Sequence, residues 1–273
     1  MVSRDPDGGD RRWLGPVAER LGHVEEVRSL SPDLWQVRAG GRVFAVKTGP
    51  STPDEAVGLA QLHRLTGPNG ILAVPEVVLA TTDLLVTAWV EPGPRSSRHE
   101  ESLGNGLAEL HTTRWPTWGG GSSWIGGCRV DPAEHADGAS FYRARIVDLA
   151  GRCGLSRPAA AVVERFDDLI PPGPPSLVHG DLWWGNVVWG GDGRPWLIDP
   201  SAHGGLPEED LAMLGLFGAV PTRTLDAYRQ RLAPTAGWDD RVALLRVIPL
   251  LVHAILFGAG YRAQAESVLQ QFS

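Results

Sequence analysis

The pattern of apolar residues changes near residue 95. Before this point five short runs, at residues 23–30, 34–39, 42–47, 75–80 and 84–90, are rich in the residues that favour strands. One helix is expected at residues 52–67, with Thr52 as its N-cap, Pro53 at its first position and Gly67 at its end. Beyond residue 95 the spacing is mainly helical. This order predicts an α+β chain, with a small N-terminal antiparallel sheet and one helix, followed by a larger, mainly helical part.

The proline- and glycine-rich stretch at residues 91–97 predicts the boundary between the two parts. We therefore expect an N-terminal lobe of residues 1–91 and a C-terminal lobe of residues 92–273. The first ten residues contain no apolar run, so a flexible tail is expected there and not a secretory signal.

Charge and cysteine content argue against several classes of protein. With 25 basic and 32 acidic residues the net charge is −7, which offers no general attraction for nucleic acid or an anionic membrane. The most apolar stretch, residues 242–260, contains Arg246, Pro249 and His253 and is too polar to span a lipid bilayer. Cys128 and Cys153 fit neither a disulfide framework nor a four-ligand zinc site. We expect a cytoplasmic protein without a nucleic-acid or membrane partner.

Lys47 is the single lysine of the chain, and the other 24 basic residues are arginines. It ends the third predicted strand. A compact ammonium group suits crowded anions better than a planar guanidinium does, so Lys47 is a candidate for binding phosphate groups. Glu55, in the first turn of the next helix, can either form an ion pair with Lys47 or complete a capping box with Thr52. The sequence leaves both alternatives open.

Two candidate metal ligands, Asn186 and Asp199, flank a predicted hairpin inside the helical part. Placing Asp192 and Gly193 in a two-residue turn sets Asn186 opposite Asp199 at the open end of the hairpin. Mg²⁺ prefers oxygen ligands and is usually bound by one or two protein groups together with substrate phosphates. The pair therefore predicts a magnesium site.

Asp181 precedes Asn186 by five residues, which is the spacing of the catalytic loop of kinases. In that loop the aspartate accepts the proton of the attacking hydroxyl group. Asp181 is therefore the candidate base, with Lys47 as the candidate cation for the phosphates of a nucleotide and Glu55 as the carboxylate that orients Lys47.

Four neighbouring residues are candidates for supporting this loop. His179 suits a bracing role through hydrogen bonds better than a catalytic one. Trp183 and Trp184 can stack on a sugar or form a wall of the site, and we expect packing for one of them. Asp210 can be an ordinary acid of a first helical turn or an anchor of the catalytic loop.

Longer segments resemble the fructosamine kinase family (ketosamine 3-kinases), within the wider group that includes aminoglycoside and choline kinases. The resemblance covers most of the chain. It is carried by HGDLWWGN at residues 179–186, by residues 197–218, which include IDP, EEDLAM and LFG, and by residues 44–47, 55–62, 103–111 and 124–126.

The resemblance implies a protein-kinase-like fold of two lobes, with ATP and Mg²⁺ as cofactors. It implies transfer of the γ-phosphoryl group of ATP to the 3-hydroxyl of a ketosamine or glycated amine. Asp181 would be the base, and Asn186 and Asp199 would bind Mg²⁺. The resemblance also implies an adenine-binding segment, formed by Ala88, Trp89, Val90 and Glu91. The distinctive tryptophan of the family matches Trp183, and its two acids match Glu208 and Asp210.

Two other functions remain open. Residues 29–35 contain no glycine where the family usually has glycines that approach phosphate, which allows a nucleotide-binding module without turnover. Pro207, His203 and Gly204 stand where the family commonly has an arginine and tyrosines near the acceptor. This departure allows another hydroxylated amine, such as an aminoglycoside, as the acceptor.

Overall fold

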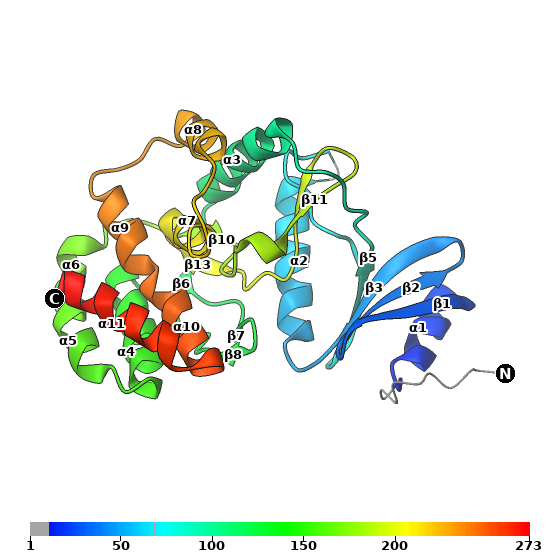
Figure 1. Ribbon diagram of the computed structural model, residues 1–273, viewed down its shortest axis with the longest axis horizontal. Coiled ribbons are helices and arrows are strands. Elements are labelled where there is room, and N and C mark those ends of the chain that lie inside the picture. The colour runs from blue at the N-terminus through cyan, green and yellow to red at the C-terminus, as the bar shows by residue number, and fades with distance from the viewer. Residues whose placement is uncertain (1–10, 68) are drawn as a thin grey trace.

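The computed structural model describes residues 11–67 and 69–273. A five-stranded sheet lies at one end of the molecule and a mainly helical part at the other, with helix α2 (Thr52–Thr66) between them (Figure 1). This arrangement confirms the predicted α+β fold. The flexible tail expected at residues 1–10 lies outside the described residues. Within the described residues, no helix combines the length and the apolar character needed to cross a membrane.

The antiparallel sheet places Lys47 on the face that looks toward the helical part. Its strand order is β1-β2-β3-β5-β4. Successive side chains of a strand point to opposite faces. In β3, Phe44 and Val46 are therefore buried in the core on one face, whereas Ala45 and Lys47 line a cavity on the other. The strands are β1 (Val24–Ser31), β2 (Leu34–Ala39), β3 (Arg42–Thr48), β4 (Val77–Ala80) and β5 (Leu84–Ala88).

A short helix that the sequence did not predict, α1 (Leu14–Leu21), covers the other face of the sheet. Its Val17 is fully buried, and the preceding Trp13 packs on Trp35 of β2 with ring centroids 5.0 Å apart. Eight residues contain only two helical turns, which is too short for a helical period to be recognised in a sequence. The helix depends on this packing for its stability.

The N-terminus of α2 differs from the prediction by one residue. Ser51 precedes the helix, and the hydroxyl group of Thr52 donates to the carbonyl oxygen of Gly49 at 2.8 Å instead of capping. Glu55 forms an ion pair with Lys47 and no capping box. Of the two alternatives for Glu55, the structure contains the ion pair.

The helical part begins at Ser97, after an extended stretch at residues 89–96. Residues 207–273 contain five helices, and the apolar stretch at residues 242–260 divides at Arg246. Pro249, in the first turn of the later helix, cannot continue an earlier one without a clash at the carbonyl of residue 245. The helices are α3 (Ser97–Thr112), α4 (Gly138–Arg152), α5 (Ser156–Val163), α6 (Phe166–Leu169), α7 (Pro207–Leu214), α8 (Thr222–Arg231), α9 (Trp238–Leu245), α10 (Val247–Phe257) and α11 (Ala259–Phe272).

Short strands among these helices hold the loops of the candidate site. One sheet has the order β10-β13-β6-β9, and β7 pairs with β8. Strand β10 leads directly into the loop that contains Asp181, and β13 leads into α7. These strands are β6 (Trp118–Gly119), β7 (Trp124–Ile125), β8 (Cys128–Arg129), β9 (Glu134–His135), β10 (Ser176–Val178) and β13 (His203–Gly205).

The predicted hairpin is present as β11 (Val187–Trp189) and β12 (Pro195–Leu197), but its register differs by one residue. Val187 lies opposite Leu197, not opposite residue 198. The loop has three residues because the N–H of Gly190 donates to the carbonyl oxygen of Arg194 at 2.9 Å. Gly193 has φ +83°, the left-handed conformation that a three-residue hairpin loop requires.

The shift in register changes the neighbours of the two candidate ligands. The carbonyl oxygen of Asn186 accepts a hydrogen bond from the N–H of Ile198 at 3.1 Å. Asn186 is therefore opposite Ile198, and the predicted direct pairing with Asp199 is wrong. Asp199 still lies one residue beyond this pair, so both candidates remain at the open end of the hairpin.

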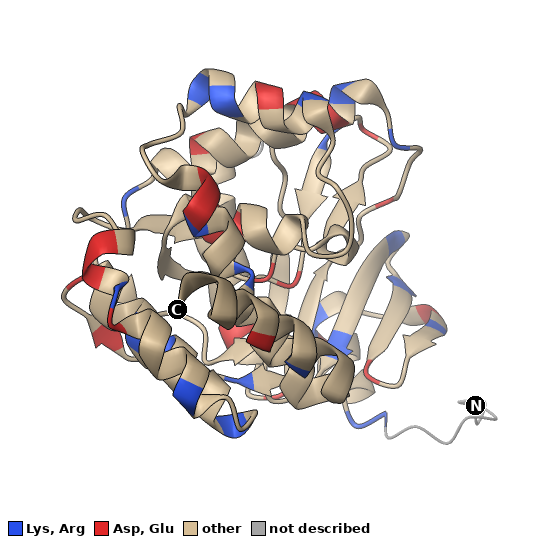
Figure 2. Ribbon diagram, turned by 60° about the vertical axis from the view of Figure 1, so that its left-hand side comes forward, with Lys and Arg blue, Asp and Glu red and all other residues tan. Residues whose placement is uncertain are grey.

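Basic and acidic residues are interspersed along the ribbon of the described residues (Figure 2). Such mixing is typical of a solvated surface.

Candidate active site

Lys47, Glu55 and Asp199 form an ion cluster between the sheet and the hairpin. The Nζ atom of Lys47 lies 2.7 Å from Oε2 of Glu55 and 3.1 Å from Oδ2 of Asp199. Burial alone would lower the pKa of Lys47, but the charges of Asp199 and Glu55 outweigh it and raise that pKa. Burial, and after it the charge of Asp199, raises the pKa of Glu55 above its usual range. Two carboxylates thus share one ammonium group, and the cluster can accept a further cation.

Asp199 is the one non-glycine residue with a positive φ angle in the described part of the chain, at +52°. This conformation is uncommon for a residue with a side chain and is often found at functional positions. Although burial would raise the pKa of Asp199, the charge of Lys47 lowers it. The carboxylate is therefore ionised, as a ligand for a divalent cation must be.

Asp181 and Asn186 lie together in the loop that follows β10. The Nδ2 group of Asn186 donates to the backbone carbonyl of Asp181 at 2.8 Å and lies 3.4 Å from its Oδ2 atom. These contacts orient the amide so that its Oδ1 atom is the one left for a cation. Burial, and after it the charge of Asp199, raises the pKa of Asp181 to about 7.

Asp210, in the first turn of α7, anchors this loop through its backbone. Its carboxylate accepts hydrogen bonds from the backbone N–H groups of His179 at 2.8 Å and Gly180 at 2.9 Å. Nε2 of His111 lies 3.1 Å from the same carboxylate, and Nδ1 of His111 lies 2.9 Å from the hydroxyl group of Tyr228. Burial would raise the pKa of Asp210, but its hydrogen bond with His111 helps to lower it. The anchoring role considered for Asp210 agrees with these contacts.

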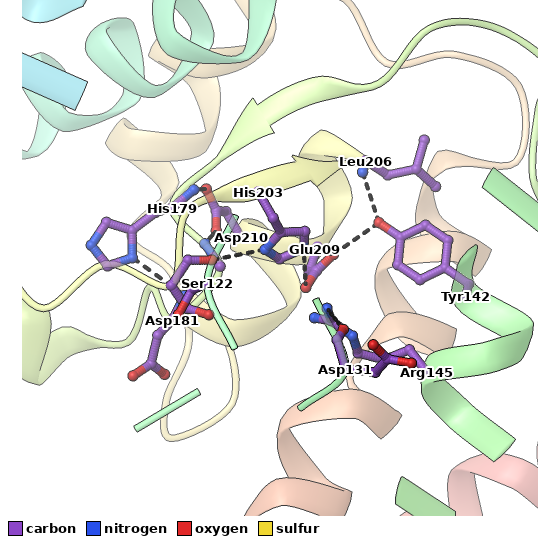
Figure 3. A network of polar contacts seen from close by, with 12 residues as sticks. Ser122, Asp131, Tyr142, Arg145, His179, Asp181, His203, Leu206, Glu209 and Asp210 are labelled. Carbon is purple, nitrogen blue, oxygen red and sulfur yellow. Dashed lines mark hydrogen bonds and ion pairs between the residues drawn. The ribbon is translucent and has the colours of Figure 1, made fainter. Parts of the chain in front are cut away.

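His179 braces the loop from within, as expected (Figure 3). Its Nδ1 atom accepts from the backbone N–H of Asp181 at 3.3 Å, and its Nε2 atom lies 3.0 Å from the carbonyl oxygen of Ile198. Because a carbonyl oxygen can only accept, Nε2 carries the proton of a neutral imidazole. Burial lowers the pKa of His179, in agreement with the neutral form.

A second layer of buried polar residues supports the loop from the side of α4 (Figure 3). The hydroxyl group of Tyr142 donates to Oε2 of Glu209 at 2.8 Å, and Nε2 of His203 lies 3.3 Å from Oε1 of the same carboxylate. His203 in turn lies against Gly180, where a Cβ atom would be 2.8 Å from Nδ1 of His203 and 2.2 Å from the carbonyl oxygen of Ser201. Only glycine fits at this point of the loop, where φ is +78°.

A cavity of about 290 Å³ opens between the sheet and the hairpin, and Lys47 and Asp199 lie in its wall. Three of the four residues expected near adenine, Ala88, Trp89 and Val90, also line it. The fourth does not. The carbonyl oxygen of Glu91 accepts from the N–H of Gly191 at 2.9 Å. Its side chain accepts from Nε1 of Trp89 at 3.2 Å.

The glycine-free segment at residues 29–35 forms the tight turn between β1 and β2. Leu30 and Leu34 on either side of the turn line the cavity. The hydroxyl group of Ser31 donates to Oδ1 of Asp33 at 2.6 Å, which fixes the turn from inside. The turn thus covers the cavity with apolar side chains, where the family usually has glycines.

The remaining predicted positions differ in their surroundings. Trp183 is 40% exposed beside the catalytic loop, and its ring covers Gly185, whereas Trp184 packs near Trp189 with ring centroids 6.1 Å apart. This agrees with the expectation that one of the two tryptophans serves packing. Glu208 is buried and forms an ion pair with Arg241 of α9 at 2.7 Å, apart from the ion cluster. His111, for which the sequence predicts no role, meets Asp210 only in the folded chain.

Solved structures with the same fold include several phosphotransferases. A structure of choline kinase from Streptococcus pneumoniae gives a TM-score of 0.67 at 14% identity, over 96% of this chain and 99% of that one. A structure from Thermobifida fusca assigned to a fructosamine-3-kinase gives 0.85 at 33% identity, over 96% of this chain and 98% of that one. The fold and the site define a phosphotransferase of the protein-kinase-like class that acts on a hydroxyl group.

The chain belongs to the fructosamine kinase family, whose model, described as "Fructosamine kinase", matches residues 34–273. A probable ketoamine kinase of Enterococcus faecium is 30% identical over 254 residues, which cover 87% of this chain and 90% of that protein. A probable ketoamine kinase of Thermus thermophilus is 32% identical over 239 residues, which cover 84% and 85% respectively. These relatives agree with the resemblance that the motifs indicated.

Proposed function

We propose that this chain transfers the γ-phosphoryl group of ATP to the 3-hydroxyl group of a ketosamine. The observation that carries the proposal is that Lys47 and Asp199 meet in the wall of one cavity, while Asp181 and Asn186 lie together in the loop that leads into the same hairpin. Membership of the fructosamine kinase family supports the choice of acceptor. In this account residues 1–91 form the nucleotide-binding lobe, and residues 92–273 provide the base and the acceptor site.

Asp181 acts as the general base. Phosphoryl transfer needs positioning and charge compensation more than covalent chemistry. Asp181, beside Asn186 in the loop, accepts the proton of the attacking hydroxyl group as the new O–P bond forms and the bond from the γ-phosphorus to ADP breaks. Its raised pKa keeps its proton affinity close to that needed near neutral pH.

Asn186 and Asp199 are the residues that would hold Mg²⁺. An amide oxygen and a carboxylate are the hard ligands that this ion prefers. Among the described residues no group of three or more His, Cys, Asp or Glu gathers as a complete metal shell. The ion would therefore complete its coordination with water and the phosphates of ATP, whose charge it would neutralise. Lys47, held by Glu55, binds the phosphates from the side of the sheet.

The nucleotide base occupies the cavity of about 290 Å³. Leu30 and Leu34 cover it from the β1–β2 turn, and Ala88, Trp89 and Val90 line it from the side of β5. The turn lacks the glycines that would let backbone N–H groups approach the phosphates. Apolar contact with the flat base compensates for those missing contacts in the binding of the nucleotide.

The test is an acceptor panel with ATP and Mg²⁺, followed by phosphorus NMR. The panel contains a fructosamine, free fructose and two aminoglycosides. We expect a new phosphomonoester signal with the fructosamine alone. Phosphorylation of aminoglycosides alone would assign the other acceptor class. Binding of ATP by calorimetry without turnover on any acceptor would assign a nucleotide-binding module.

A further inference from the structure

Five aromatic side chains form a continuous exposed surface beside the catalytic loop. Ring centroids are 6.1 Å apart between Trp183 and Phe217, and 5.1 Å apart between Phe217 and His253. From His253 the distances are 5.5 Å to Phe257 and 5.0 Å to Tyr261. Three of these side chains are well exposed, Trp183 at 40%, Phe217 at 46% and Phe257 at 68%. We name these five residues the aromatic shelf. A contiguous exposed apolar surface is more often a binding site than a surface that contacts only solvent.

The aromatic shelf starts at the proposed base. Trp183 follows Asp181 by two residues. Gly126 lies so close to Asp181 that a Cβ atom built on it would be 3.8 Å from Oδ2 of Asp181. The next residue, Gly127, lies against Leu256 of α10, with a corresponding distance of 3.7 Å. Strands β7 and β8 thus lie beside the corner between α10 and α11, on the side that faces α2 (Figure 1). An acceptor whose hydroxyl group reaches Asp181 would extend over the shelf.

The surroundings of the aromatic shelf select an uncharged group. Residues 211–220, which contain Phe217, include no Lys, Arg, Asp or Glu, and the same holds for residues 247–261. Nδ1 of His253 lies 2.7 Å from the carbonyl oxygen of Pro249, so this nitrogen donates within its own helix. These two segments therefore offer ring faces and edges and no fixed charge, and the charged residues beside them include Arg262, next to Tyr261, and Arg129 of β8. A charged group of the acceptor placed over the rings themselves would lose water without gaining a partner.

We infer that the aromatic shelf binds the substituent on the amine of the acceptor, and that it selects ketosamines of aromatic amines. The inference rests on the proposed function, because it assumes that the sugar hydroxyl lies at Asp181. Each ring contact of this kind contributes modestly to the free energy of binding. Several together favour an aromatic acceptor over a non-aromatic one by about tenfold in kcat/KM.

The experiment compares two acceptors that carry the same charge and differ by one ring, 1-deoxy-1-(benzylamino)fructose and 1-deoxy-1-(methylamino)fructose. The measured quantity is the ratio of their kcat/KM values. We expect a ratio of about ten or more in the unmodified protein. The ratio falls toward one in Phe257→Ala, whose side chain is too exposed to be needed for folding. Val147→Ala on α4, at 46% exposure, is the matched control and keeps the ratio.

A ratio near one in the unmodified protein, or an unchanged ratio in Phe257→Ala, would overturn the inference and leave the proposed function intact. Sedimentation of the unmodified protein and of Phe257→Ala tests whether a second copy of the chain occupies the shelf instead. A dimer that Phe257→Ala converts to monomer, with an unchanged ratio, would assign the shelf to contact with a second copy. If neither ketosamine is phosphorylated, the proposed function fails, and the inference fails with it.

Discussion

The Nζ atom of Lys47 lies 3.1 Å from Oδ2 of Asp199, and this contact joins the antiparallel sheet to the hairpin of the helical part. The same Nζ atom is 2.7 Å from Glu55 of α2, so three elements meet at one ammonium group. A point charge on a thin stem fits between the two carboxylates, whereas a planar guanidinium would have to displace one of them. The single lysine of the chain therefore stands where an arginine would not serve.

Lys47→Arg is expected to lower kcat/KM for ATP by about tenfold or more although it keeps the charge. Steady-state kinetics at saturating acceptor measure the change. Circular dichroism and thermal unfolding of the same preparation check that the variant is folded. Rates equal to those of the unmodified protein would mean that lysine at this position is a coincidence of composition.

Asp199→Asn is expected to raise the Mg²⁺ concentration for half-maximal activity by about tenfold or more. The amide keeps an oxygen but removes the negative charge that attracts the ion. Activity is measured against Mg²⁺ at a fixed concentration of ATP. Asp239→Asn is the matched control, because its carboxylate is 91% exposed on α9. An unchanged Mg²⁺ requirement in Asp199→Asn would exclude Asp199 as a ligand.

Asp210→Ala is expected to lower the free energy of unfolding by about 3 kcal/mol. The carboxylate is fully buried, and its removal leaves the N–H groups of His179 and Gly180 and the ring of His111 without their acceptor. Urea unfolding measures the change, with Asp239→Ala as the exposed control. A loss below 1 kcal/mol would mean that other groups hold the catalytic loop.

The titration of His179 is expected to lower the free energy of unfolding at mildly acidic pH. Burial lowers its pKa in the folded chain below the ordinary value of 6.5. As the pH falls below 6.5, the unfolded chain takes up a proton that the folded chain does not, so stability decreases, by up to about 1.4 kcal/mol per pH unit for this one group. Urea unfolding at pH 7.5 and 5.5 measures the decrease. The decrease should be smaller in His179→Gln, which cannot titrate, and an equal decrease in both proteins would contradict this role.

The sequence predicts the elements that local patterns define. Alternation in residues 42–47 correctly assigns β3 with Lys47 near its end, and the spacing of Asp181 and Asn186 correctly brings these two residues into one loop. The error in the hairpin register has a local cause. Asp192 and Gly193 are typical of a two-residue turn, but the carboxylate of Asp192 accepts from the N–H of Arg194 at 3.0 Å, and Gly193 takes the left-handed position of a three-residue loop.

What the sequence does not predict depends on contacts between distant residues. His111 reaches Asp210 across 99 residues, and Tyr142 reaches Glu209 across 67. Neither histidine nor tyrosine carries a spacing signal for such a partner, because burial and tertiary packing decide it. Helix α1 shows the same dependence on packing, since Val17 and Trp13 are buried only against the assembled sheet.

The most direct test of the account is the kcat for ketosamine phosphorylation in Asp181→Asn, measured beside the dissociation constant of ATP in the same preparation. The substitution keeps the shape of the side chain and removes its ability to accept the proton. The account predicts a kcat at least about 10²-fold lower with nearly unchanged affinity for ATP. Unchanged turnover in this variant would contradict the assignment of Asp181 as the base, and with it the proposed site of phosphoryl transfer.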